Sequence, residues 1–370
     1  MSQVVTVHLI AAARPNFMKV APLFHELSGR REFKVVLVHT GQHYDSNMSD
    51  AFFRDLRLPS PDFHLGIGSG SHAEQTGNVM IAYERVVTLS PPTCIVVVGD
   101  VNSTLACALV GAKLRIPVVH LEAGLRSGDR DMPEEINRLA TDAVSDVLWT
   151  PSPDADLNLA REGVARDRID LVGNIMIDSF EMLRGAIESD STVERLGLKA
   201  GDYMVVTVHR PSNVDHEEAL RPLVESLIMV ADSIAAVIPL HPRTRRQLER
   251  FDLLTLLASN PRIVVTEPLG YVQFMNVVKS ARGVITDSGG VQEETTYLGI
   301  PCITLRANTE RPVTVTMGTN RLCSAEGLEA AVSAVLDGRW PRGSVPPLWD
   351  GRTAMRCAER LIARFITREG

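Results

Sequence analysis

Acidic residues follow the apolar segments of the sequence at points where strands are expected to end. Asp100 follows the run VVVG, Glu122 follows the run VVHL, and Glu134 follows a proline at a predicted helix start. Carboxylates that lie close together repel one another, which can raise the pKa of one of them to suit acid/base catalysis. Alternatively, Asp100 supports a helix start, and Glu134 and Glu135 complement a helix dipole. We favour catalysis because three acidic positions come from the carboxyl edge of one predicted sheet.

Residues suited to binding phosphate occur in both halves of the chain. The segment 287–294, DSGGVQEE, follows a predicted strand and opens a helix. Its glycines expose backbone N–H groups at the helix N-terminus, which favours a diphosphate. Glu294, one helical turn further on, is placed to hold ribose hydroxyls. In the first half, Arg14 and Lys19 follow the first strand and are suited to phosphate or a sugar hydroxyl, although an ordinary turn with solvated cations has the same pattern.

A histidine closes the first predicted strand of the second half. His209 is followed by Arg210, and a histidine at a strand end can act as a general acid or donate to phosphate. A single histidine is more often structural, but the adjacent arginine and the position at the strand end favour function. His241 ends the next strand in a similar way, with less support.

The elements that must position these residues alternate between strand and helix. Short apolar runs rich in β-branched residues predict buried parallel strands, and amphipathic segments between them predict helices. The fold class is therefore α/β, with two doubly wound, Rossmann-like domains facing a central cleft at the carboxyl ends of the strands. We expect these domains at residues 1–173 and 174–352, and a C-terminal helix at 353–370 that packs back on the first domain. The predicted strands are residues 4–10, 34–39, 94–98, 117–121 and 147–150, then 203–208, 235–239, 262–266, 283–286 and 302–305.

Composition limits the class of protein. Of 370 residues, 45% are hydrophobic and 22% charged, which is typical of a globular protein. No apolar run reaches the roughly 18 residues of a membrane helix, and the N-terminus lacks a signal-peptide pattern, so we expect a cytoplasmic protein with no membrane partner. The net charge of -7 argues against nucleic acid as a partner. The five cysteines form no C-x-x-C pair, which indicates reduced thiols and no zinc site.

Taken together, these residues give the chain a specific family likeness. It resembles the non-hydrolysing UDP-N-acetylglucosamine 2-epimerases, which have the two-domain GT-B fold. The resemblance covers nearly the whole chain, from Arg14 to about Asn320. The motifs that carry it are RP at 14–15 with Lys19, GD at 99–100, HLEAGLR at 120–126, PEExNR at 133–138, GN at 173–174, TVHR at 207–210, DSGGxQEE at 287–294 and TERP at 309–312.

The resemblance implies inversion at C2 of a UDP-N-acetylhexosamine, without NAD, another cofactor or a metal. A proton leaves C2 and UDP is expelled to give a 2-acetamidoglucal; a proton then returns to the other face and UDP is re-added. The resemblance does not settle which acid attacks C2, and it implies a homodimer. Bacterial relatives have an activating UDP-sugar site near Gln42 and His43. By the same resemblance, the acid/base group is Asp100, Glu122, Glu134 and His209, and the substrate is held by Arg14, Lys19, Phe274, Ser288, Gly289, Gly290, Glu294 and Arg311.

Departures from the family pattern lie beside the motifs. Ala12 and Ala13 stand where Gly-Thr is common, and Asn16 stands where Glu is frequent. They leave the class intact and leave the particular sugar open. Three other functions also stay open. A hydrolysing 2-epimerase would release UDP and N-acetylmannosamine, a GT-B glycosyltransferase would need an acceptor, and a non-catalytic UDP-sugar sensor would gain nothing from repelling carboxylates.

Overall fold

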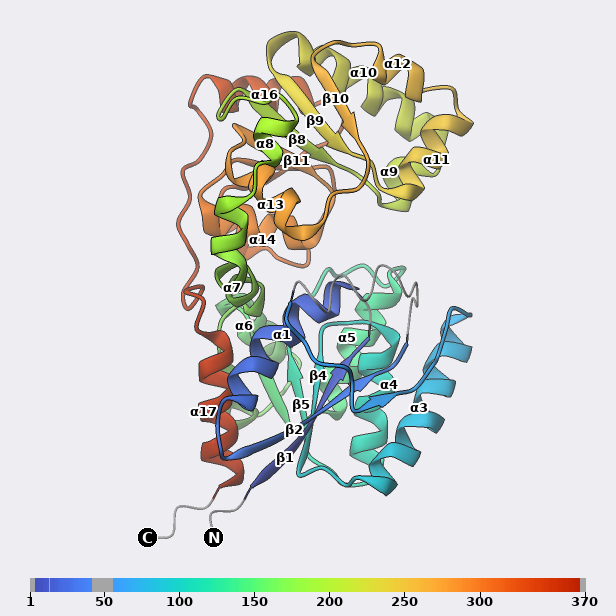
Figure 1. Cartoon of the computed structure of the whole chain (residues 1–370), viewed down its shortest axis with the longest axis vertical. Helices are drawn as coiled ribbons and strands as arrows, with labels where there is room; N and C mark the ends of the chain where they lie inside the picture. The colour runs from blue at the N-terminus through green and yellow to red at the C-terminus, as the bar shows by residue number, and fades with distance from the viewer. Residues whose placement is uncertain (1–3, 13, 42–55, 367–370) are drawn as a thin grey trace. The chain divides into compact units, whose positions relative to one another are not determined.

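Two α/β units make up the chain. The structure, a computed structural model, describes residues 4–12, 14–41 and 56–366. Unit 1 comprises Met1–Met182 and Pro347–Gly370, and unit 2 comprises Leu183–Pro346. Each unit contains one parallel sheet with helices packed on it (Figure 1). The predicted α/β class with two doubly wound sheets is confirmed.

The sheet of unit 1 has the strand order β3-β2-β1-β4-β5-β6-β7, and all its neighbouring strands are parallel. The first strand therefore lies between the second and the fourth, so the chain winds outward in both directions from this switch point. The strands are β1 (Val5–Ala11), β2 (Phe33–His39), β3 (Phe63–His64), β4 (Cys94–Val98), β5 (Val118–Leu121), β6 (Val147–Thr150) and β7 (Ile169–Leu171). The helices are α1 (Arg14–Ser28), α3 (His72–Leu89), α4 (Asn102–Lys113), α5 (Pro133–Val144), α6 (Pro153–Arg161), α7 (Ile175–Ser189), which continues into unit 2, and α17 (Thr353–Phe365), with a 3-10 turn at Arg166–Arg168.

Unit 2 repeats this arrangement. Its order, β10-β9-β8-β11-β12-β13, again places the first strand of the unit in the middle of a parallel sheet. The strands are β8 (Tyr203–Thr207), β9 (Ala235–Pro239), β10 (Ile263–Thr266), β11 (Gly283–Thr286), β12 (Cys302–Thr304) and β13 (Asn320–Leu322). The helices are α8 (Thr192–Arg195), α9 (Pro211–Val214), α10 (Glu217–Ser233), α11 (Pro242–Arg250), α12 (Leu254–Ala258), α13 (Tyr271–Lys279), α14 (Gly289–Leu298), α15 (Val313–Thr316) and α16 (Leu328–Leu336).

Burial explains why the apolar runs form these strands. Every residue of β4, β5, β6 and β11 is buried, since helices cover both faces of a parallel sheet. The three strands that the sequence did not predict, β3, β7 and β13, all lie at sheet edges and contain only two or three residues each. Such short segments have no apolar pattern to detect.

The C-terminal helix belongs to unit 1, where α17 packs against α1 (Figure 1). The carboxylate of Asp178 on α7 accepts hydrogen bonds from the backbone N–H groups of Thr353 (3.1 Å) and Ala354 (2.7 Å), in the first turn of α17. A carboxylate at this end complements the helix dipole and satisfies donors that have no partner within the helix. Just before α17, the indole of Trp349 donates to the carbonyl oxygen of Pro151 at 2.8 Å.

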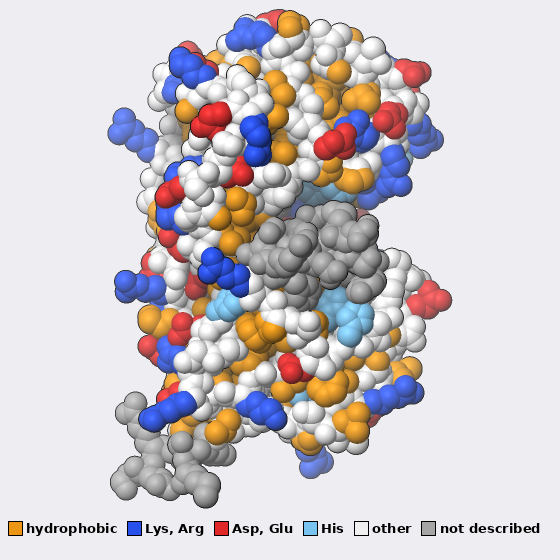
Figure 2. All heavy atoms as spheres, in the orientation of Figure 1, with side chains coloured by type: hydrophobic (Ala, Val, Ile, Leu, Met, Phe, Trp, Pro, Cys, Tyr) orange, Lys and Arg blue, Asp and Glu red, His pale blue; other side chains and the backbone are white. Residues whose placement is uncertain are grey.

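Surface charge is mixed on the face shown in Figure 2, where Lys and Arg side chains alternate with Asp and Glu. An anionic ligand on this face would therefore need a local cluster of donors rather than a broad basic surface. Among the described residues, no helix has the length and apolar character that crossing a bilayer requires.

Candidate active site

The carboxyl edge of unit 1 brings predicted site residues together at its switch point. Lys19, on α1, forms an ion pair with Oε2 of Glu122, which follows β5. Gly99, after β4, lies against both partners: a Cβ atom there would be 3.3 Å from Glu122 Oε2 and 3.4 Å from Lys19 Nζ. The structure thus joins a residue predicted to bind substrate to one predicted to be catalytic.

The backbone at Glu122 is strained. Its φ of 71° lies in the left-handed region, which a non-glycine residue rarely adopts, and the residue is only 3% exposed. Such a conformation costs about 1–3 kcal/mol and persists where the surrounding structure enforces it, typically at functional sites. The outlier therefore supports a functional role for this carboxylate.

Helix α5 fixes Asp100 through its side chain and its backbone. Arg138 donates to Oδ2 of Asp100 from Nε (3.0 Å) and Nη2 (2.6 Å), and Asn137 donates to the Asp100 carbonyl oxygen at 2.9 Å. The Asp100 side chain remains 29% exposed, so a ligand can still reach it. Asp100 is thus a positioned and accessible carboxylate.

The adjacent acids at the start of α5 differ in their surroundings. Glu135 is buried and accepts from the backbone N–H groups of Ser127 (3.0 Å) and Gly128 (2.9 Å) and from Arg138 (2.7 Å). Burial alone would raise the pKa of Glu135, but these donors outweigh it and the pKa is lowered. Glu134 is exposed. Glu135 therefore holds the 127–128 loop, and Glu134 is the member of the pair that solvent reaches.

Replacing Gly99 with alanine is expected to lower both stability and turnover. The φ of Gly99 is 70°, so the substitution strains the backbone, and the new Cβ would crowd the Lys19–Glu122 pair. We expect a loss of about 1–2 kcal/mol in the free energy of unfolding. Thermal unfolding and kcat of the variant test this, with Gly185→Ala, where nothing lies within 4 Å of the added Cβ, as the control. Equal effects of the two substitutions would contradict it.

In unit 2, β8 and β11 end at the switch point with His209 and Asp287. Nδ1 of His209 lies 3.0 Å from Oδ1 of Asp287, which is fully buried. Asp287 also accepts from the backbone N–H of Arg210 (2.8 Å) and from Asn213 Nδ2 (3.0 Å). Burial would raise the pKa of Asp287, but His209 and these donors outweigh it and lower the pKa. Asp287 therefore orients the imidazole, and Nε2 is the nitrogen placed to act on a ligand.

Helix α14 begins at Gly289, directly after Ser288, so the SGG segment lies at a helix N-terminus. A Cβ atom on Gly289 would be 2.6 Å from Arg311 Nη1 and 2.7 Å from Glu310 Oε1, so only glycine admits this ion pair. Arg311 also pairs with Glu293, at 2.9 Å. Arg311 is thus held in a buried network against the start of α14.

Glu294, buried on α14, pairs with the half-buried Tyr271 at the start of α13. Tyr271 Oη donates to Glu294 Oε1 at 2.7 Å. Burial raises the pKa of Glu294 to about 8, although the bond from Tyr271 opposes the shift. Phe274 lies three residues beyond Tyr271 on α13, on the same side of that helix. Sequence reasoning missed Tyr271, and its spacing from Phe274 is the one signal that pointed to it.

Some predicted positions cannot be placed. Arg14 begins α1, but its side chain lies outside the described part of the structure, as do Gln42 and His43 altogether. Within the described part, no group of His, Cys, Asp or Glu side chains is arranged to hold a metal ion.

Comparison with known proteins identifies the family. The model of the UDP-N-acetylglucosamine 2-epimerase family matches residues 25–362. The chain belongs to this 2-epimerase family. A UDP-N-acetylglucosamine 2-epimerase of Methanocaldococcus jannaschii is 41% identical over 366 residues, which cover 97% of this chain and 98% of that protein. A UDP-2,3-diacetamido-2,3-dideoxy-D-glucuronate 2-epimerase of Pseudomonas aeruginosa is 40% identical over 320 residues, covering 85% of this chain and 87% of that protein.

Comparison with a solved structure agrees with this family assignment. The crystal structure of the M. jannaschii enzyme in complex with UDP-GlcNAc and UDP matches with a TM-score of 0.88 and 41% identity, covering 97% of this chain and 99% of that one. The predicted resemblance and the GT-B type of fold are thereby confirmed.

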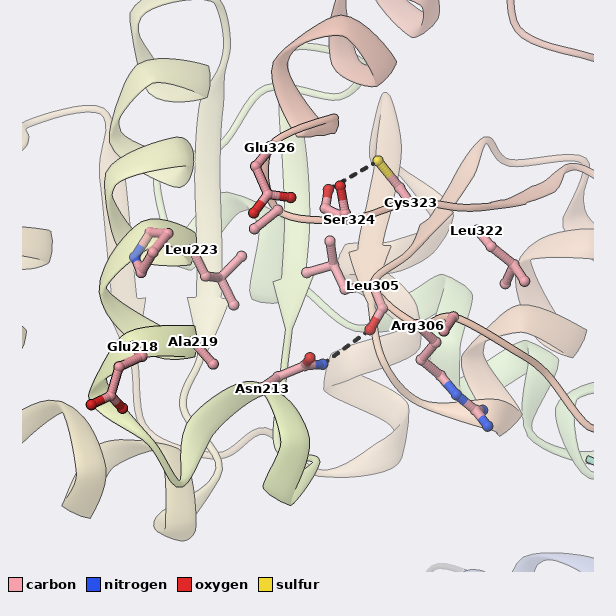
Figure 3. Close-up of a pocket in the computed structure, with 13 residues that line it drawn as sticks. Asn213, Glu218, Ala219, Leu223, Leu305, Arg306, Leu322, Cys323, Ser324 and Glu326 are labelled. Carbon is pink, nitrogen blue, oxygen red and sulfur yellow. Dashed lines mark hydrogen bonds between the residues drawn. The ribbon is translucent and has the colours of Figure 1, made fainter. Parts of the chain in front are cut away.

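A further pocket in unit 2 adjoins the 2-epimerase motifs: Asn213, which lines it, donates to Asp287, and Arg306, which also lines it, pairs with Glu310 at 2.7 Å. Its volume is about 510 Å³, and Figure 3 shows it between α10 and the segment after β13. Leu223, Leu305 and Cys323 line it, and Glu218 and Glu326 lie at its rim. None of the predicted site residues lines this pocket, so we assign it no role in the reaction.

Proposed function

We propose that the chain interconverts UDP-N-acetylglucosamine and UDP-N-acetylmannosamine and retains UDP between the two half-reactions. The observation that carries the proposal is the cluster of Lys19, Gly99, Asp100 and Glu122 at the switch point of unit 1, in a chain of the 2-epimerase family. A binding protein would have no use for a strained, buried carboxylate beside a second, half-buried one.

The proposal assigns the nucleotide to unit 2. The N–H groups at the start of α14 suit the diphosphate, because a helix N-terminus favours negative charge. Glu294 suits the ribose hydroxyls, since a buried carboxylate with one tyrosine donor can accept further hydrogen bonds. Phe274, on the neighbouring α13, is assigned to the uracil ring.

The chemistry at the sugar is assigned to unit 1. A carboxylate takes the proton from C2, and the electrons of that C–H bond form the C1–C2 double bond. The C1–O bond breaks at the same time, and UDP leaves with its electron pair. Protonation of the opposite face of C2 and re-addition of UDP at C1 complete the inversion. Opposite faces need two groups, and the proposal draws them from the three carboxylates Asp100, Glu122 and Glu134.

His209 is proposed to stabilise the departing UDP. Its Nδ1 is held by Asp287, so Nε2 is directed by a fixed partner. A donor aimed at the oxygen where charge develops lowers the barrier to departure. Removal of the weakly acidic C2 proton also becomes easier when the leaving group is already stabilised.

Proton NMR of the protein with UDP-N-acetylglucosamine in D2O tests the proposal. We expect deuterium at C2 and an equilibrium mixture with UDP-N-acetylmannosamine. Free deuterated N-acetylmannosamine with UDP would instead establish a hydrolysing enzyme. If this sugar neither exchanges nor releases UDP, while the diacetamido-glucuronate substrate named for the P. aeruginosa relative does exchange, the proposed substrate is wrong and the proposed reaction stands.

A further inference from the structure

His120 is a fully buried histidine with an acceptor at each ring nitrogen. Nδ1 lies 2.6 Å from Oδ1 of Asp142, and Nε2 lies 2.8 Å from the carbonyl oxygen of Gly99. A carbonyl oxygen can only accept, and so can an ionised carboxylate. A neutral imidazole has one N–H group and would leave one of these contacts without a proton. Both contacts are satisfied together when both nitrogens carry a proton.

Asp142 is surrounded by groups that stabilise its ionised form. Besides His120, it accepts from the backbone N–H of Gly124 at 3.0 Å, and it pairs with Arg126 Nη2 at 2.7 Å. Burial would raise the pKa of Asp142, but His120 and Arg126 outweigh burial and lower it. Glu162 also binds Arg126, at 2.7 Å.

We propose that both ring nitrogens of His120 carry a proton, and that its buried ion pair with Asp142 positions the strand ends that carry Asp100 and Glu122. The assignment of the charge rests on the two ring contacts and on the donors around Asp142, whereas its consequence for turnover rests on the proposed function. His120 and Asp142 do not touch the substrate in this scheme. They act through the backbone.

The connections that would transmit this effect are short. Gly99, whose carbonyl oxygen faces His120, directly precedes Asp100. Glu122 lies between two residues bound by Asp142, namely His120 and Gly124. One carboxylate thus holds both sides of the residue with the left-handed backbone. Without Asp142, the strained turn at Glu122 would lose the hydrogen bonds that compensate the energetic cost of its backbone conformation.

Helix α5 gathers these contacts on one face. Arg138 and Asp142 are four residues apart, so they lie side by side on the helix. Arg138 binds the side chain of Asp100, and Asp142 binds the turn at Glu122. A single helix face therefore sets the positions of Asp100 and Glu122 relative to each other.

His8 provides an internal reference for the opposite protonation state. It is also fully buried, but its Nδ1 contacts the hydroxyl of Tyr83 at 3.1 Å, and the nearby Asp62 carboxylate acts on the ring only through its charge. A hydroxyl can donate as well as accept, so a neutral ring is satisfied there. Burial lowers the pKa of His8 to about 4.

Nitrogen-15 NMR of the histidine rings in the whole protein tests the charge. Loss of one signal in His120→Gln and of another in His8→Asn assigns the two residues among the ten histidines. At pH 7, we expect His120 to show two protonated ring nitrogens and His8 one. A neutral His120 at pH 7 would overturn the proposal, whatever reaction the protein catalyses.

Variants test the positioning. In His120→Leu we expect kcat to fall about 100-fold, the size of effect that a misplaced catalytic group produces, with KM unchanged. His120→Gln should recover part of kcat, since its amide can donate to the Gly99 carbonyl oxygen. His8→Leu, also a buried change in a strand of unit 1, should leave kcat unchanged. A folded His120→Leu protein with wild-type kcat would overturn the positioning role.

A readout that does not depend on turnover separates this proposal from the proposed function. The backbone amide signals of Asp100 and Glu122 should shift in His120→Leu and stay in place in His8→Leu. If the wild-type protein lacks 2-epimerase activity but these signals shift and His120 is doubly protonated, the proposed function fails and the ion pair stands. If activity is present and the signals do not shift, the ion-pair proposal fails alone.

Discussion

Replacing Glu122 with glutamine is expected to lower kcat by about 10²–10⁴-fold, the range that a positioned acid or base contributes. Glutamine keeps the shape of the side chain and can still accept a hydrogen bond from Lys19, but it cannot exchange a proton with C2. Affinity for UDP should change little, because the start of α14, Glu294 and Phe274, which the proposal assigns to the nucleotide, lie in unit 2. Steady-state kinetics and titration calorimetry with UDP measure the two quantities separately.

The loss of an ion pair has to be separated from the loss of a base. Glu122 is buried against Lys19, so the variant is also expected to unfold at a lower temperature. Glu84→Gln, at an exposed position on α3, controls for the change of charge. Deuterium exchange at C2, measured below the unfolding temperature, reports on the base alone. Wild-type exchange in Glu122→Gln would remove Glu122 from the mechanism.

Binding of UDP is expected to strengthen as the pH rises toward 8. In the free protein, burial raises the pKa of Glu294 to about 8, so the group is mostly protonated at pH 7. Ribose hydroxyls donate to the ionised form, so binding favours that form and releases a proton. Below pH 8, the affinity should therefore fall by up to about tenfold per pH unit. Calorimetry in two buffers that differ in ionisation enthalpy measures the released proton.

Two variants isolate this effect from titration of the UDP phosphate. Glu294→Gln cannot titrate at this position, so it should not release the proton that Glu294 releases on UDP binding. It should bind UDP about 10-fold or more weakly, since a hydrogen bond to a charged group contributes about 1.5–3 kcal/mol. Tyr271→Phe removes the hydroxyl that opposes the rise in the pKa of Glu294, so this pKa should be higher in the variant than in the wild type. The affinity of the variant for UDP should therefore go on rising to a higher pH. Proton release that is identical in wild type and Glu294→Gln would show that the ribose binds elsewhere.

The sequence predicted those parts of the site that lie at strand ends. Parallel strands end at one edge, so Asp100 and Glu122 could be placed together from the order of the elements alone. The residues that contact these two acids could not be predicted in this way. Lys19 and Glu122 are separated by 103 positions, and nothing in either local segment indicates that they pair.

Residues on helices were harder to predict than residues on strand ends. Asp142 and Tyr271 each lie within a helix, and which face of a helix meets the site depends on how the helix packs on the sheet. Glu134 and Glu135 are adjacent and chemically identical, yet one is exposed and the other buried. The 127–128 loop and Arg138, which Glu135 binds, distinguish them.

The return of α17 to unit 1 has a consequence for the order in which the chain can fold. Unit 2 is one continuous segment, whereas unit 1 needs residues on both sides of it, including the capping contact between Asp178 and Ala354. During synthesis, the ribosome completes all of unit 2 before it releases α17. Until then, the face of α1 that α17 covers stays open to solvent. Unit 1, whose synthesis begins before that of unit 2, is therefore completed after it.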